Sequence, residues 1–167
     1  MTIANTLLQE LEQEAPTTRR LLERVPDAQL SWRPHEKART LGALAMHVAM
    51  VPGAVAELAA TASPAQVPEF GEEPGNQRAA ELVRTLDDSV ATARRALSGM
   101  DDATIMATWR VVAGERELMA LPRAAFLRAI MLNHWYHHRG QLSVYLRFLG
   151  VPVPSIYGPS ADENPFV

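Results

Sequence analysis

Apolar residues recur at three- and four-residue spacing along most of this chain, which is the pattern of amphipathic helices. The pattern predicts four long helices, at about residues 2–24, 41–58, 76–97 and 122–149. Thr40 is a good N-cap for the second helix, Pro122 is tolerated in the first turn of the fourth, and Gly150 ends it. Pro52 and Gly53 inside the second helix predict a kink or break near its middle.

The segments between these helices contain residues that break regular structure. Pro34 blocks a helix in the segment 30–40, and the Pro- and Gly-rich segment 61–76 is typical of a loop. In 101–121, Trp109 and the residues after it favour a strand, which predicts an extended crossover or a small hairpin. The chain is therefore expected to form one all-α domain over residues 1–167, a four-helix bundle with crossover connections.

Composition excludes several functional classes. The 167 residues are 47% hydrophobic and 21% charged with a net charge of −3, so no basic field is present to attract nucleic acid or an anionic membrane. Without Cys there are no disulfides and no thiolate nucleophiles or ligands. The first residues do not resemble a signal peptide, and no apolar run is expected to span a bilayer. These observations favour a cytoplasmic protein.

Candidate chemistry is concentrated in the histidines. His134 and His138 lie four residues apart in the last helix, so both imidazoles can reach one ion. His137 lies roughly 60° round the helix from His134, at about 100° per residue, and is the poorer ligand. His47 lies on the apolar face of the second helix, so the three form a plausible site for one ion.

Neighbouring residues in the last helix are interpreted by the same helical period. The periodicity places His134 and His138 on the core side of the helix, with Gln141 and Tyr145 beside them as candidate outer-sphere groups. Arg139 is expected to face solvent. Gly140, which weakens the helix, is expected to allow close contact with another helix.

A different interpretation needs no metal, because a hydrogen-bonded cluster of three core histidines also satisfies buried imidazoles. The zinc-protease pattern HExxH is absent, since Trp135 stands at the Glu position. If an ion is bound, imidazole ligands favour zinc, nickel, copper or iron(II), whereas magnesium and calcium prefer oxygen ligands.

The segment HHRGQLSVYLRFLG, preceded by His134, resembles the signature of the DinB/YfiT-like family, the DNA-damage-inducible proteins that are distinct from the polymerase of that name. The likeness extends to LSWRP, TLGALAMHVA and VPVPSIYGPSADE, and so spans most of the chain. It implies an up-down-down-up four-helix bundle, often a homodimer. It also implies a metal triad at His47, His134 and His138, the set that the spacing indicates independently.

The resemblance further implies a metal-dependent enzyme that acts with a low-molecular-weight thiol on an electrophilic small molecule, by thiol transfer, isomerisation or hydrolysis. Zinc or nickel is the first candidate for the metal, with iron(II) or manganese after them. Possible outer-sphere residues are Gln141, Tyr145 and His137. The alternative is a metal-binding stress-response module without catalytic activity.

Overall fold

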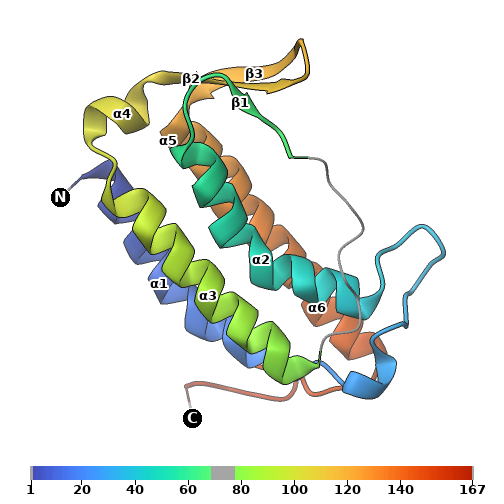
Figure 1. The fold of residues 1–167 in the computed structure, drawn as a ribbon. Coiled ribbons are helices and arrows are strands. Elements are labelled where there is room, and N and C mark those ends of the chain that lie inside the picture. The colour runs from blue at the N-terminus through green and yellow to red at the C-terminus, as the bar shows by residue number, and fades with distance from the viewer. Residues whose placement is uncertain (1, 69–77, 167) are drawn as a thin grey trace.

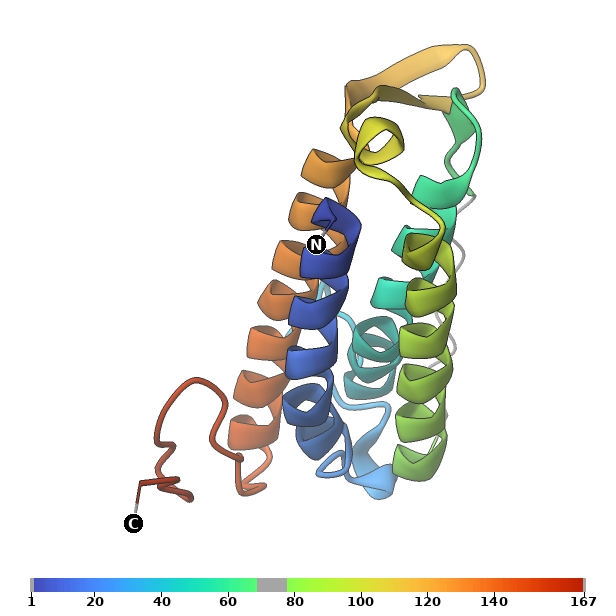
Figure 2. The same cartoon turned by 90° about the vertical axis from the view of Figure 1, so that its left-hand side faces the viewer.

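Long helices make up most of the computed structural model, which describes residues 2–68 and 78–166 (Figure 1). Three of them are α1 (Ile3–Leu22), α2 (Leu41–Ala60) and α3 (Ala79–Ser98). A C-terminal helical segment follows as α5 (Arg123–Phe126), the π-helical η2 (Leu127–Asn133) and α6 (His134–Phe148). α1 and the C-terminal segment run in one direction along the molecule, and α2 and α3 run in the other (Figures 1 and 2).

The helix ends follow the capping residues in the sequence. The hydroxyl of Thr40 accepts a hydrogen bond from the Ala43 N–H at 3.2 Å, which confirms it as the N-cap of α2. Gly150 follows α6 with φ of +69°, the left-handed conformation that glycine adopts readily. The predicted start of the third helix near residue 76 lies outside the described residues. At Ala79, where α3 begins, the N–H donates to the carboxylate of Asp27 in the short 3-10 helix η1 (Asp27–Gln29).

A small sheet closes one end of the molecule. The predicted hairpin is confirmed as β2 (Thr108–Ala113) paired antiparallel with β3 (Arg116–Pro122), and Gly114 turns between them with φ of +59°. Two features were not predicted: the short helix α4 (Asp102–Met106), and β1 (Ala65–Gln66), which pairs parallel with β2 inside the expected loop. β1 is only two residues long and forms by pairing with a strand distant in sequence, so its own residues carry no pattern that identifies it as a strand.

The middle of α2 is irregular, as Pro52 predicts. The helix continues through the proline, and its ribbon bends near the middle (Figure 1). Contrary to expectation, α2 is long and apolar enough to span a membrane, by length and composition alone. Leu44, Val48 and Ala56 are nonetheless completely buried by the other helices, so its hydropathy is that of a core helix.

The C-terminal segment buries a line of side chains spaced four residues apart. Leu127, Met131, Trp135 and Arg139 are all at most 1% exposed. In a regular α-helix a four-residue step drifts about 40° round the axis, so this line would soon leave the core. The π-helical turns of η2 hold more residues per turn, which reduces the drift.

Arg139 is the residue whose predicted environment was most clearly wrong. It is 1% exposed, and its guanidinium forms an ion pair with Glu14 at 2.7 Å and donates to the Thr18 hydroxyl at 3.2 Å. It also donates to the hydroxyl of Tyr157 in the C-terminal tail. An α-helical projection could not place Arg139 inside, because the buried face is set by partners on α1 and in the tail.

Gly140 also differs from expectation. Apart from its chain neighbours and the backbone of its own helix, no atom of the described residues lies within 4 Å of a Cβ built on it, so no close helix contact requires a glycine there. The close approach instead occurs at Gly53 in α2, where a Cβ would lie 2.8 Å from the Ser89 carbonyl oxygen of α3.

Candidate metal centre

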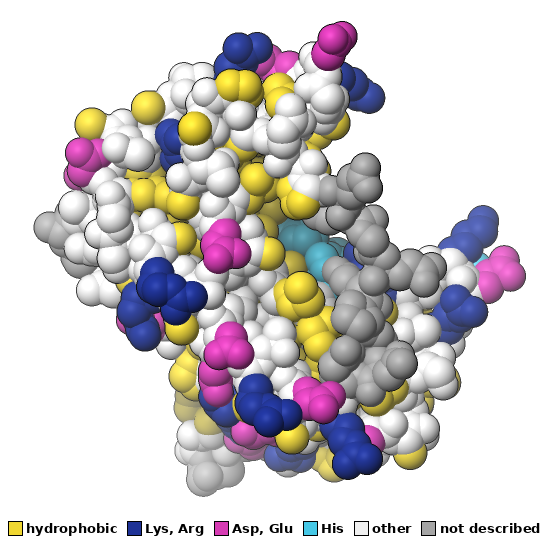
Figure 3. Space-filling model, in the orientation of Figure 1, with side chains coloured by type: hydrophobic (Ala, Val, Ile, Leu, Met, Phe, Trp, Pro, Cys, Tyr) yellow, Lys and Arg dark blue, Asp and Glu magenta, His cyan; other side chains and the backbone are white. Residues whose placement is uncertain are grey.

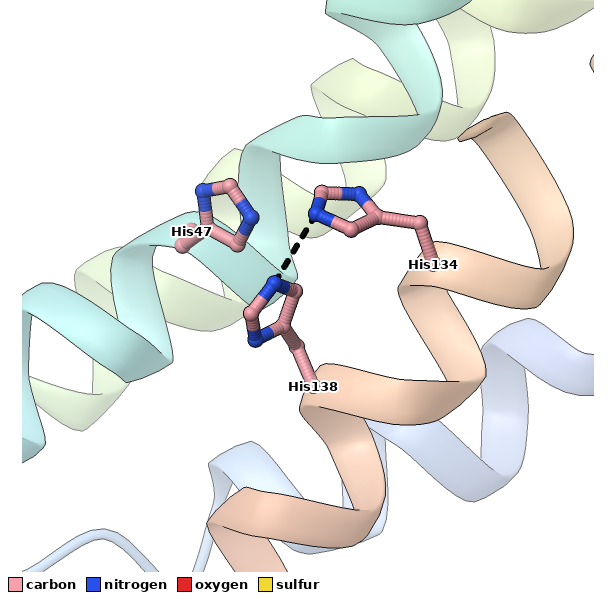
Figure 4. Close-up of side chains that lie close together, drawn as sticks. All are labelled: His47, His134 and His138. Carbon is pink, nitrogen blue, oxygen red and sulfur yellow. Dashed lines mark hydrogen bonds between the residues drawn. The ribbon is translucent and has the colours of Figure 1, made fainter. Parts of the chain in front are cut away.

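His47, His134 and His138 converge from two helices (Figure 4). His47 projects from α2 just before the bend, and His134 is the first residue of α6, directly after η2. His138 follows one turn later. All three side chains are half-buried, and the rings of His134 and His138 both face the ring of His47.

The three rings are in direct contact. The Nε2 atoms of His134 and His138 lie 2.9 Å apart, and the His47 ring centroid lies 5.1 Å and 4.4 Å from those of His134 and His138. One nitrogen from each ring can be chosen so that all three lie within 4.8 Å of one another. The convergence expected from the sequence spacing is therefore present.

The separation of the His134 and His138 nitrogens fits a single transition-metal ion. Metal–nitrogen bonds of ~2.1 Å place two ligand nitrogens about 3.0 Å apart at a right angle and about 3.4 Å apart in a tetrahedron. The 2.9 Å between His134 and His138 is already close to the first value. The three candidate ligand nitrogens lie within 4.8 Å of one another, and three protein ligands leave coordination positions open.

Gln141 orients one of the ligands. Gln141 lies one turn after His138 on α6, and its Oε1 is 2.7 Å from Nδ1 of His138. An amide oxygen accepts a hydrogen bond, so Nδ1 of His138 carries the proton and Nε2 presents its lone pair to the other two rings. This is the outer-sphere arrangement typical of metal-ligating histidines.

The electrostatics of the cluster favour neutral imidazoles. Burial, reinforced by the nearby His47 and His137, lowers the pKa of His134. Burial is also the main cause that lowers the pKa of His138 to about 4, against the Gln141 hydrogen bond, which raises it. Both rings are therefore uncharged at neutral pH, with one nitrogen of each free of a proton, which is the form that binds a metal.

The other candidate residues lie around the cluster. His137 is exposed, with its ring 5.0 Å from that of His138. The Tyr145 hydroxyl donates to the Arg39 carbonyl at 3.3 Å, and its ring packs edge-on against Trp32. Of the three candidate outer-sphere residues, therefore, Gln141 is the one with a hydrogen bond to a proposed ligand among the described contacts.

The site is open to solvent on one side. Figure 3 shows histidine side chains in a hollow of the molecular surface, with hydrophobic side chains beside them. Gln141 is exposed, whereas Trp135 and Leu142 on the neighbouring face of α6 are completely buried. The ligand pair therefore lies at the edge of the core rather than fully within it.

A hydrogen bond that was not identified from the sequence joins α6 to α2 beside the site. The indole N–H of Trp135 donates to the carbonyl oxygen of Val48 at 2.8 Å. A signal for it was present in the sequence, because Pro52 has no N–H to offer the carbonyl four residues earlier.

Comparison with known proteins gives a consistent result. A family model described as "DinB family" matches residues 1–164. The chain is 25% identical over 156 residues to the uncharacterised protein YrdA of Bacillus subtilis, covering 93% of this chain and 89% of that protein.

Two solved structures are similar in fold. A DinB-like protein from Bacillus cereus superposes with a TM-score of 0.71 at 24% identity, over 90% of this chain and 95% of the other. The DinB-like protein YjoA from Bacillus subtilis gives 0.64 at 17% identity, over 87% and 92%. At these identities the likeness concerns the fold alone.

Proposed function

The chain belongs to the DinB family, and from that premise we propose that it binds one divalent transition metal through His47, His134 and His138. The observation that carries the proposal is the placement of three imidazole nitrogens within 4.8 Å of one another. The proposal includes the fold class, an up-down-down-up four-helix bundle of the DinB/YfiT type with the small sheet as its crossover.

The ligand set limits the choice of metal. Three imidazoles without thiolate suit zinc or nickel first, with iron(II) or manganese as further candidates. Imidazoles with depressed pKa values bind such ions at neutral pH without competition from protons. The metal-free alternative remains testable, because the 2.9 Å contact of His134 with His138 is also a good N–H···N hydrogen bond.

We propose that the bound site acts on an electrophilic small molecule with a low-molecular-weight thiol, by thiol transfer, isomerisation or hydrolysis. An ion with open coordination positions lowers the pKa of a bound thiol or water and polarises a carbonyl group. The chain has no Cys, so the thiol arrives as a cosubstrate. In this scheme the three histidines hold the geometry, Gln141 fixes the tautomer of His138, and the hollow admits both reactants.

The setting of this activity is also part of the proposal. A net charge of −3 and a buried apolar α2 support a cytoplasmic protein that acts without nucleic acid or a membrane. A homodimer is proposed from the family resemblance.

Metal analysis of tag-free protein, purified without chelators, is the first test. We expect about one equivalent of transition metal in wild type and a large loss in His138→Ala. The protein is then loaded with zinc, nickel, manganese or iron(II) and assayed for conjugation of small thiols to electrophiles. Thiol conjugation that persists in His138→Ala at the wild-type rate would contradict the enzymatic proposal.

The same experiment identifies the non-catalytic alternative. A metal-binding stress-response module gains thermal stability from the ion, because ligand binding to the native state stabilises it, yet shows no turnover with any thiol. Wild-type protein that neither contains nor takes up metal would leave the hydrogen-bonded histidine cluster as the correct interpretation.

A further inference from the structure

Trp135 joins the two helices that carry the proposed ligands. It follows His134 directly on α6, is completely buried, and donates its indole N–H to the Val48 carbonyl oxygen at 2.8 Å. Val48 in turn follows His47 on α2. One buried hydrogen bond therefore connects the residues next to a ligand on each helix.

The Val48 carbonyl is available because of Pro52. In an α-helix the carbonyl of residue 48 would accept from the N–H of residue 52, which proline lacks. The proline ring also crowds the carbonyl four residues before it, which turns that group away from the helix. A buried carbonyl without a donor is costly, so the indole of Trp135 replaces a missing backbone bond.

A second group stabilises the same bend from the other side. The N–H of Gly53 donates to the Ser89 hydroxyl at 2.7 Å, and that hydroxyl donates to the Met50 carbonyl at 3.0 Å. Side chains from α6 and α3 thus pair with the backbone of α2 through the turn that follows His47. The orientation of this turn is therefore fixed by both neighbouring helices.

We infer that Trp135 is a positioning residue for the metal site, which uses the carbonyl exposed by Pro52 to set the separation of His47 from His134 and His138. The inference rests on the proposed metal binding. Functional constellations require geometry within about 0.5 Å, and rigid supports of this kind supply it. The indole acts through the backbone and does not itself contact the ion.

The test is a Co²⁺ titration of metal-free protein, followed by visible absorption, which reports coordination geometry as well as affinity. Trp135→Phe keeps an aromatic ring in the core but removes the N–H donor together with part of the indole ring, a loss of volume that the control variant below reproduces. We expect it to bind Co²⁺ at least about tenfold more weakly, the size of effect typical of outer-sphere changes, with an altered spectrum.

Trp109→Phe is the matched control. Trp109 is also completely buried, but it lies in β2, and its indole nitrogen has no hydrogen-bond partner within the described residues. We expect wild-type Co²⁺ affinity and spectrum from this variant, whatever its loss of stability. A Trp135→Phe protein that matches wild type in both affinity and spectrum would overturn the positioning role.

A double variant separates positioning from simple stability. Pro52→Ala restores an N–H opposite the Val48 carbonyl, so Trp135→Phe with Pro52→Ala should regain thermal stability relative to Trp135→Phe alone. The link between the helices stays broken, so Co²⁺ binding should remain weak. Recovery of Co²⁺ affinity together with stability would show that Trp135 acts only on stability. Wild-type protein that binds no Co²⁺ would instead overturn the proposed metal site.

Discussion

At the scale of single residues, the histidine cluster depends on which nitrogen of each ring carries a proton. The Gln141 oxygen, 2.7 Å from Nδ1 of His138, keeps the proton on that atom and leaves Nε2 free to face His134. The exposed side chain of Gln141 therefore determines the tautomer of the half-buried His138. This gives Gln141 a role that its exposure alone would not suggest.

Removing this oxygen should weaken metal binding. We expect Gln141→Ala to raise the Kd for Zn²⁺ by about 10- to 100-fold, because the His138 ring loses the group that fixes its tautomer and orientation. Competition with a chromophoric chelator measures the change. Gln9→Ala, at an exposed position of α1, is the control and should leave the Kd unchanged. Equal affinities in the two variants would exclude an outer-sphere role for Gln141.

The depressed pKa of His138 also makes metal-free protein sensitive to acid. Its pKa is about 4 in the folded state, where burial disfavours the charged ring, and 6.5 in the unfolded chain. Between these values the unfolded chain binds more protons, so stability rises with pH. The His138 contribution is therefore present above about pH 6.5 and is lost as the pH falls toward 4.

Thermal unfolding of chelator-treated protein at pH 7.0 and pH 4.5 tests this dependence. Carboxylates also titrate near the lower pH, so the comparison is with His138→Gln, which has a neutral amide at the same place. We expect a larger fall in Tm for wild type than for His138→Gln. The same fall in both proteins would show that His138 does not contribute to acid sensitivity.

At the scale of elements, α2 and the C-terminal segment both depart from regular α-helix beside the site. Pro52 bends α2 after His47, and η2 gives way to α6 at His134. π-helical turns occur frequently at functional sites, because they redirect the side chains that follow. The two irregular segments together determine which way the ligands point.

Two glycines allow a direct test of the packing between elements. Gly53→Ala would place a Cβ 2.8 Å from the Ser89 backbone, so α2 and α3 must separate, and we expect about 1–3 kcal/mol of destabilisation. The Cβ of Gly140→Ala meets no described atom within 4 Å beyond its chain neighbours and the backbone of its own helix, and the variant should stabilise the protein by about 1 kcal/mol through helix propensity. Denaturant unfolding measures both, and effects of the same sign would contradict this account of the packing.

At the scale of the whole molecule, buried and partly exposed arginines fasten the C-terminal tail to the helices. Arg139 joins Glu14 of α1 to Tyr157 of the tail, and the Tyr157 hydroxyl donates to the Glu14 carboxylate at 2.9 Å. Asp162 in the tail pairs with Arg147 of α6. The C-terminal tail therefore has a structural role, because polar contacts to the buried Arg139 and to Arg147 hold it against the helices.

Arg139→Met should destabilise the whole protein. The variant keeps much of the side-chain volume but leaves the Glu14 carboxylate, only 20% exposed, without its charged partner, and we expect a loss of about 3 kcal/mol. Urea unfolding gives the value. Arg147→Met is the exposed control and should cost much less, because solvent screens its pair with Asp162. If the two losses are equal, the buried cluster does not anchor the tail.

The sequence by itself determined the long helices, most of their ends and the residues of the candidate site. These features have local causes: apolar periodicity, N-caps such as Thr40, the glycine after α6, and the four-residue spacing of His134 and His138. The hairpin was also predictable, because Trp109 and its neighbours favour a strand and Gly114 a turn.

Only the tertiary structure decided how those elements meet. Arg139 is buried because Glu14 neutralises its charge and Tyr157 accepts a hydrogen bond from it, and both residues lie outside α6. The Trp135 bond to Val48 likewise depends on two helices lying side by side. A helical projection assumes one period and an isolated element, whereas burial and the final direction of each side chain are set by partners brought together through folding.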